Sequence, residues 1–293
     1  MVLSRPRLIA VAAATTAAAA ALVVPTGSVA ADVRTHTTNL RVFGVTQSDV
    51  LVRFPAAYPA ALNRVGPVTG LAAGETLIGI DFRVQDGLLY GVGDAGNIYT
   101  ITRRTAVATE VSELTVPLSG EEFGVDFNPA ADALRIISDD TQNLRHSFPT
   151  DTTTVDTPLT NPPVPPATTP TPATGVTMAA YTNNDLDTTT GTTLFDVDTD
   201  LDRVAIQAPA NNGTLNPTGG IGVDAQARGD IDVYSGLNDD GRTDANVFFA
   251  TIKIPGEAHK LYRLAPLTGL LTEVGRFGNG AAVVDVALPL DQN

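Results

Sequence analysis

Short apolar runs separated by turn residues fill the chain from about residue 40 onward. In the clearest stretch, runs rich in Val, Ile, Leu and aromatic residues are broken by clusters of Gly, Asp and Asn, which is the pattern of β-strands joined by tight turns. No stretch after residue 31 repeats its apolar residues at the helical period over a useful length. The strands expected in the clearest stretch are residues 77–82, 88–92, 98–102 and 106–111. Four strands joined in this way form a meander, which is one blade of a β-propeller.

One phrase recurs along the chain. Gly79-Ile80-Asp81-Phe82 returns as Gly124-Val125-Asp126-Phe127, and each copy is followed at the same spacing by a second apolar run. Looser copies are Ala180-Tyr181-Thr182, Gly222-Val223-Asp224 and Val284-Asp285-Val286. Self-similarity of strand-like units at a period of a few tens of residues is typical of a propeller.

The two ends of the repeat predict how the ring closes. Residues 42–45 match the second strand of the unit and residues 50–54 match the third, but no inner strand precedes them. Residues 282–288 form an inner strand at the other end of the chain. We therefore predict an all-β, five-bladed β-propeller over residues 32–293, closed by pairing of the C-terminal strand with the N-terminal blade, which removes the open sheet edges.

Residues 1–31 differ from the rest of the chain. Arg5 and Arg7 precede an alanine-rich apolar run over residues 8–24, and Ser28-Val29-Ala30-Ala31 supplies small residues for cleavage. This arrangement is typical of a secretory signal peptide and predicts a secreted, extracellular protein. An uncleaved anchor is the alternative, although the apolar run is at the short edge of what spans a bilayer.

The net charge limits the classes of binding partner, and the cysteine content limits how the fold can be stabilised. The formal net charge is −14, and it becomes −16 when the two arginines of the leader are removed. Such acidity argues against nucleic acid and anionic membrane as partners, because both require a basic face. The chain has no cysteine, so burial of the core must hold it together without disulfides. We expect a monomer with no membrane span after leader cleavage.

Several phrases resemble those of a secreted bacterial family catalogued as domain of unknown function 4394, which is often described as propeller-like. The matching segments are residues 71–82, 124–129, 142–145, 180–184 and 211–216, and the resemblance covers roughly residues 38–289. It implies the fold and export only, because the family brings no assigned activity, cofactor or catalytic residues. The chain departs from the family between Asp156 and Gly175, where seven prolines lie within residues 158–172. We interpret residues 156–175 as a Pro-rich loop of the propeller, with a domain linker as the alternative.

Acidic residues in the turns between second and third strands suggest a cation site on the face of the propeller that carries the Pro-rich loop. Of these residues, Asp198, Asp200 and Asp202 are close enough in sequence to converge on one ion, and calcium favours such oxygen ligands. The alternative is that aspartate is simply suited to hairpin turns.

The segment around residues 238–244 is a second calcium candidate. Asn238, Asp240 and Asp244 alternate as in a calcium-binding loop around Gly241, but the distal glutamate is missing, so a solvated loop is the alternative. No cofactor is otherwise expected.

The repeated aspartates Asp81, Asp126, Asp224 and Asp285 could line a central channel, but their recurrence favours a structural hydrogen-bonding role. In this alignment Tyr181 stands where the other units carry aspartate. Tyr181 with Asn183 and Asn184 therefore forms the ligand-binding hypothesis, because an aromatic face and amides can hold a sugar or peptide. The alternative for Tyr181 is core filling.

No catalytic motif is present. There is no Gly-x-Ser-x-Gly elbow, phosphate loop or His-Glu-x-x-His pattern, and the three histidines (His36, His146 and His259) are expected at isolated surface positions. The leading hypothesis is a secreted, non-catalytic propeller that binds an unassigned ligand, such as a surface polysaccharide or a protein. The alternative is an extracellular propeller hydrolase or lyase, either calcium-dependent or calcium-independent, which should show a deep acid-lined axial pocket with raised carboxyl pKa values.

Overall fold

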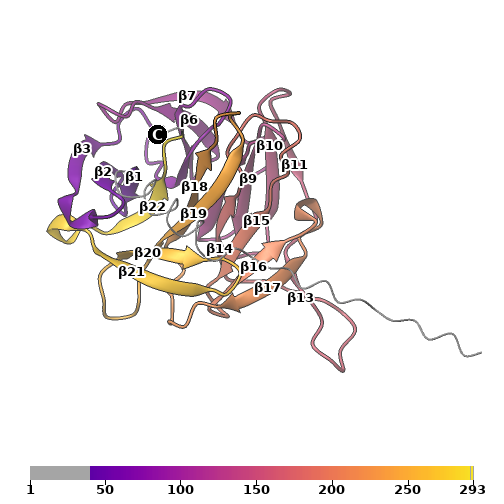
Figure 1. Ribbon diagram of the computed structural model, residues 1–293. Coiled ribbons are helices and arrows are strands. Elements are labelled where there is room, and N and C mark those ends of the chain that lie inside the picture. The colour runs from indigo at the N-terminus through magenta and orange to yellow at the C-terminus, as the bar shows by residue number, and fades with distance from the viewer. Residues whose placement is uncertain (1–39, 291, 293) are drawn as a thin grey trace, which may run out of the picture.

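The computed structural model of the protein describes residues 40–290 and 292, and it is a five-bladed β-propeller (Figure 1). Each blade is a four-stranded antiparallel sheet in which neighbouring strands are hydrogen-bonded in order from the inner strand outward. Blade 1 contains β22 (Val283–Ala287), β1 (Arg41–Thr46), β2 (Val50–Pro55) and β3 (Asn63–Pro67); blade 2 contains β4 (Leu77–Phe82), β5 (Leu89–Gly93), β6 (Asn97–Ile101) and β7 (Ala108–Glu113); blade 3 contains β8 (Phe123–Asn128), β9 (Ala133–Ser138), β10 (Asn143–Ser147) and β11 (Thr152–Val155); blade 4 contains β14 (Val176–Tyr181), β15 (Leu194–Asp198), β16 (Arg203–Gln207) and β17 (Leu215–Gly220); blade 5 contains β18 (Asp230–Leu237), β19 (Thr243–Ile252), β20 (Lys260–Ala265) and β21 (Leu270–Arg276).

The ring closes as the sequence predicts. The yellow C-terminal strand β22 lies beside the indigo strand β1 in Figure 1 and pairs with it antiparallel, with Phe43 opposite Ala287 and Val45 opposite Asp285. The predicted signal peptide and His36 fall on residues 1–39, which lie outside the described residues. Within the described part of the chain, no helix has the length and apolarity needed to cross a bilayer.

The hydrophobic core is divided among the junctions between blades. Successive strand residues point to opposite faces of each sheet, and both faces are covered by neighbouring blades. Phe43 of blade 1 meets Phe82 of blade 2 edge to face at 6.0 Å, and Phe195 of blade 4 meets Phe248 of blade 5 at 5.2 Å. The ring is therefore held together by apolar contacts between blades.

The glycines of the repeated phrase allow inner strands to approach closely. A Cβ at Gly79 would lie 2.6 Å from Val125 Cβ, and a Cβ at Gly124 would lie 2.7 Å from the backbone nitrogen of Ala179. Both distances are too short for real carbon contacts, so only glycine fits these positions.

The Pro-rich segment, residues 156–175, folds back onto the propeller. It connects β11 to β14 and contains a small hairpin of β12 (Thr160–Asn161) and β13 (Thr171–Pro172). Leu159 and Ala173, at its two ends, are fully buried, whereas the tip between them is mostly exposed.

The inner strand of blade 5 begins later than the repeated phrase suggested. Asp224 is exposed and lies in the loop before β18, so its assignment to the inner strand was wrong. Within β18, Asp232 stands opposite Phe249 of β19, as Asp81 stands opposite Tyr90 in blade 2. The letters Gly222-Val223-Asp224 copy the phrase, but the paired strand carries its aspartate eight residues further on.

Two other positions of the repeat shift by small amounts. Tyr181 is opposite Leu194, just as Phe127 is opposite Leu134, so Tyr181 is equivalent to the phenylalanine of the phrase and Ala180 takes the place of the aspartate. In β22, Ala287 takes that place, and Asp285 lies two residues earlier, at the position of Gly79. The aligned phrases are residues 79–82, 124–127, 178–181, 230–233 and 285–288.

Candidate functional site

Five buried aspartates line the propeller axis in two tiers. Asp81, Asp126 and Asp232 occupy the aspartate position of the phrase, and Asp230 and Asp285 occupy the position two residues earlier on the same strand face. None is more than 7% exposed. The inner strands of blades 1, 2, 3 and 5 therefore direct these side chains toward the propeller axis.

Most of these carboxylates join one blade to the next. Asp81 accepts the N–H of Phe127 at 2.8 Å, and Asp126 accepts the N–H of Tyr181 at 2.9 Å. The same pattern links blade 1 to blade 2, where Asp285 accepts the N–H of Ile80 at 3.0 Å.

Blade 5 carries two such links to blade 1. Asp230 accepts the N–H of Val286 at 3.1 Å, and Asp232 accepts the N–H of Leu288 at 2.5 Å. The aspartates at the axis therefore have the structural hydrogen-bonding role that the sequence favoured, at four of the five junctions.

Desolvation and mutual repulsion disturb the protonation of the axial groups. Burial raises the pKa of Asp232 to about 7. Burial, followed by the charge of Asp232, raises the pKa of Asp81 well above its usual range, and burial with the charges of Asp81 and Asp232 does the same to Asp126. The axis is therefore a place where negative charge is costly unless a proton or a cation compensates it.

A cavity of about 390 Å³ lies at the mouth of this axis. It is on the face where the inner strands begin, over blades 1, 2, 3 and 5, and the turn containing Asp94 opens onto it. Its volume is near the lower end of the roughly 300–1,000 Å³ common for ligand pockets. Its charged lining residues are Asp94, Glu121, Glu122, Arg228 and Asp285.

Arg228 is the one base among the described residues that line this cavity. Its guanidinium makes no hydrogen bond or ion pair with another described residue. The backbone at Arg228 is held by His259, whose Nε2 lies 3.2 Å from the Arg228 carbonyl oxygen. Burial lowers the pKa of His259 and raises that of Glu122, and the charge of Arg228 opposes the shift at Glu122. The pocket thus combines an acidic lining with one unengaged donor group.

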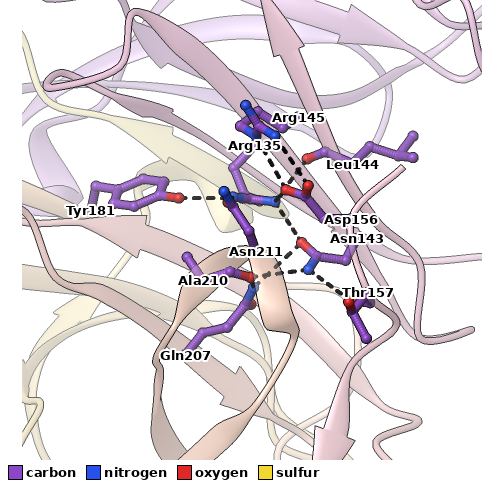
Figure 2. Close-up of polar contacts among 10 residues, drawn as sticks. All are labelled: Arg135, Asn143, Leu144, Arg145, Asp156, Thr157, Tyr181, Gln207, Ala210 and Asn211. Carbon is purple, nitrogen blue, oxygen red and sulfur yellow. Dashed lines mark hydrogen bonds and ion pairs between the residues drawn. The ribbon is translucent and has the colours of Figure 1, made fainter. Parts of the chain in front are cut away.

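Tyr181 lies away from this pocket, in the junction between blades 3 and 4. It is 2% exposed, and its hydroxyl oxygen accepts a hydrogen bond from Arg135 Nε at 3.2 Å. Figure 2 shows Arg135 extending between Tyr181 and the side chains of Asn143, Asp156 and Asn211. In this arrangement the tyrosine ring fills the core, which is the alternative that the sequence left open.

Asn183 and Asn184 follow β14 on the face opposite the pocket. Asn183 exchanges hydrogen bonds with Asn246, and Asn184 donates from its side chain to the Val233 carbonyl oxygen at 3.0 Å and from its backbone to Ser235 Oγ at 2.9 Å. These contacts bridge blades 4 and 5, the one junction that lacks an axial aspartate link. The two asparagines therefore supply hydrogen bonds at the junction between blades 4 and 5.

The first predicted metal triad is engaged by the protein itself. Asp198 is fully buried and accepts the N–H of Leu201 at 3.0 Å, Asp202 accepts the N–H of Ala225 at 2.9 Å, and Asp200 is exposed. Within the described residues, these three do not form a convergent ligand group.

The segment around residues 238–244 is the exposed hairpin between β18 and β19. Asn238 accepts the N–H groups of Asp240 and Arg242 at 3.0 Å each, and Asp240 and Asp244 are exposed. The side-chain oxygen of Asn238 therefore stabilises the turn, and the segment fits the alternative of a solvated loop. Among the described residues, the group that does converge is Asp81, Asp126 and Asp232.

Sequence reasoning missed Asp230, Asp232 and Arg228. The Asp-x-Asp spacing of residues 230–232 within an apolar run was a usable signal, because alternating residues share one face of a strand. Nothing local distinguishes Arg228 from other loop arginines. The histidines were also misplaced: His146 and His259 are buried, at 0% and 4% exposure.

Residues 50–287 match the model of a family described as a domain of unknown function, DUF4394. The chain belongs to this family. No curated protein matches this DUF4394 chain. Among solved structures, it resembles a structural-genomics protein of unknown function from Bacteroides thetaiotaomicron VPI-5482, with 13% identity and a TM-score of 0.45 over 86% of this chain. This chain spans 64% of that protein's length. It also resembles the glutaminyl cyclase of Myxococcus xanthus, with 13% identity and a TM-score of 0.43 over 83% of each chain. Neither likeness indicates a function for this chain.

Proposed function

We propose that this DUF4394 protein is an exported, non-catalytic propeller that binds a small ligand bearing a primary amine in its axial pocket. The observation that carries the proposal is the lining of that pocket, which includes four carboxylates and one arginine whose guanidinium makes no hydrogen bond or ion pair with another described residue. A protonated amine fits beside the carboxylates, because a desolvated ion pair with hydrogen bonds offsets the cost of burying each charge. Export rests on the leader pattern of residues 1–31.

Arg228 adds a second requirement for the chemistry of the ligand. Arg228 presents donors only, so the part of the ligand next to it must supply acceptors such as hydroxyl or carboxylate oxygens. An amino sugar has both features, an amine and neighbouring hydroxyls. The formal net charge, −14 for the full chain and −16 without the two arginines of the leader, adds attraction for a cationic ligand at low ionic strength.

Calorimetric titration with glucosamine and chitosan oligosaccharides, against N-acetylglucosamine and chitin oligosaccharides, tests the proposal. Acetylation removes the charge and leaves the sugar ring, so we expect at least about tenfold weaker binding of the acetylated forms. Glu122→Gln should reduce amine affinity by a similar factor, and Glu110→Gln, on the exposed side of β7, should not. Equal binding of both series would contradict the assignment of the amine.

The hydrolase alternative has one observation in its favour. The axial pocket is lined by Asp285 and Glu122, whose pKa values are both raised by burial, and a pair of carboxyl groups is what glycoside hydrolysis requires. Binding remains the better supported function, because one oxygen of Asp285 is held by the Ile80 N–H. Release of reducing ends from the same oligosaccharides, abolished by Glu122→Gln, would establish the hydrolase instead.

A further inference from the structure

The loop between β17 and β18, residues 221–229, carries Arg228 to the axial pocket. Its first half is tied to the β15–β16 turn, where the carbonyl oxygen of Asp202 accepts the N–H of Ile221 at 2.8 Å and its side chain accepts the N–H of Ala225 at 2.9 Å. Ile221 and Ala225 are also buried in the apolar core shared by blades 4 and 5. This half of the loop is therefore fixed to the fold.

The second half of the loop is tied to blade 5. The Gln226 N–H donates to the Lys253 carbonyl oxygen at 2.8 Å. Gly229 packs so closely that a Cβ there would lie 2.4 Å from the Thr251 carbonyl oxygen, an approach that only glycine allows. These two contacts hold the backbone on both sides of Arg228.

His259 makes the contact at Arg228 itself. Its Nε2 lies 3.2 Å from the Arg228 carbonyl oxygen, and because a carbonyl oxygen can only accept, Nε2 must carry the proton. His259 is buried and belongs to the loop between β19 and β20. Burial lowers the pKa of His259, the hydrogen bond to the Arg228 carbonyl opposes the shift, and the charges of Lys253 and Arg228 add to it. The imidazole is therefore neutral near pH 7, and its one N–H group is committed to this carbonyl.

The guanidinium carried by this loop acts on carboxylates from three elements. Its charge opposes the rise in pKa that burial causes at Asp49 in the β1–β2 turn, at Glu122 before β8 and at Asp285 in β22. It makes no hydrogen bond or ion pair with another described residue. Because a charge acts most strongly on its nearest neighbours, the Arg228 side chain lies among these three acids without binding any of them.

We infer that His259 is a positioning residue that sets which ligands the axial pocket selects. By holding the Arg228 carbonyl, it fixes the point from which a long and flexible side chain starts, and so keeps the guanidinium donors over the pocket. Such donors favour an amine that carries hydroxyl or carboxylate oxygens over an amine of similar size without them, because the donors are otherwise left unpaired. The selection of ligands rests on the proposed function, whereas the placement of Arg228 does not.

Glucosamine and cyclohexylamine measure this selectivity, because both have a six-membered ring and a protonated amine but only glucosamine has hydroxyl groups. In calorimetric titrations, we expect the wild-type protein to bind glucosamine at least about tenfold more tightly than cyclohexylamine. His259→Leu removes the N–H donor and should bring the ratio of the two affinities close to one, as should Arg228→Gln. His259→Gln keeps an N–H donor and should retain the wild-type ratio. A wild-type ratio in His259→Leu would overturn the inference.

The pKa of Glu122 in the free protein gives a test that needs no ligand. Release of Arg228 withdraws a charge that opposes the pKa rise of Glu122, so NMR titrations should give a higher Glu122 pKa in His259→Leu and Arg228→Gln than in wild type and His259→Gln. The control is Asp187 on the opposite face, whose pKa is lowered to about 2 chiefly by hydrogen bonds from Thr189 and should not change in any variant. An unchanged Glu122 pKa in His259→Leu would refute the positioning of Arg228, whereas failure of the wild type to bind either amine would refute the proposed function.

If His259→Leu does not fold, heteronuclear NMR of the wild-type imidazole decides the contact. We expect the proton on Nε2, where it can be donated to the Arg228 carbonyl. A neutral ring with its proton on Nδ1 would overturn the inference.

Discussion

At the scale of single residues, the protein buries polar side chains whose loss of hydration is offset by specific hydrogen-bond partners. The axial aspartates receive backbone N–H groups from the next blade, and Arg135 is buried among four polar side chains in the junction of blades 3 and 4. Asp196, in the same junction, is different. Both of its oxygens are buried and have no hydrogen-bond partner.

Asp196→Asn should stabilise the protein at high pH. Burial raises the pKa of Asp196 well above its usual range, so the wild-type contribution is fully present below the unfolded pKa of about 3.9 and is lost as pH rises through the folded pKa. The amide cannot ionise. Chemical denaturation should show a gain of about 1–3 kcal/mol at pH 8 and little change at pH 4. A variant less stable than wild type at both pH values would show that the carboxylate has a partner.

Gly79→Ala tests the close approach of inner strands. The added methyl group would meet Val125 Cβ at 2.6 Å, so we expect a loss of about 1–3 kcal/mol from overpacking. Gly66→Ala is the control, because nothing lies within 4 Å of its Cβ position. Its free energy of unfolding should change by no more than about 0.5 kcal/mol. Equal effects of the two substitutions would mean that the Gly79 contact can relax.

At the scale of elements, the ring depends on β22, which arrives from the far end of the chain. This strand pairs with β1 and receives the links from Asp230 and Asp232. Deletion of residues 280–293 should therefore abolish cooperative unfolding in circular dichroism melts. A truncated chain that melts like the full chain would rule out the closure of the ring as its main support.

The Pro-rich segment has an exposed tip and a buried end, and substitutions in the two parts should change the free energy of unfolding by different amounts. Replacing residues 163–169 with a Gly-Ser linker removes only the exposed tip and should change the free energy of unfolding by about 0.5 kcal/mol or less. Leu159→Ala, at the buried end of the segment, should cost about 2–5 kcal/mol. A large loss from the tip replacement would indicate that the tip contributes to packing.

At the scale of the whole molecule, the sequence predicted the five blades and their closure because the repeated phrase marks inner strands. It misassigned Asp224 because glycine is replaced by Asp230 and phenylalanine by Val233 in the true strand, so the best copy of the letters was not the strand that pairs. Tyr181 was displaced by one position, because β14 carries Ala180 where the other phrases carry aspartate and so lacks the residue that marks the register.

The candidate site was beyond the reach of spacing arguments. Its charged lining comes from turns and inner strands that are far apart in the chain, and Glu122 and Arg228 are more than 100 residues apart. The sequence did place the acidic turns and the Pro-rich segment on one face. The pocket forms because the closed ring brings residues of blades 1, 2, 3 and 5 together at one end of the axis.

The most direct test of the account compares Glu122→Gln with Asn184→Ala in titrations with chitosan oligosaccharides. The first variant changes the axial pocket, and the second removes a side chain that bridges blades 4 and 5 on the opposite face. We predict at least about tenfold weaker binding for Glu122→Gln. For Asn184→Ala we predict a lower Tm with unchanged affinity. Loss of affinity in Asn184→Ala with full binding by Glu122→Gln would contradict the account and return the site to the Tyr181–Asn184 segment.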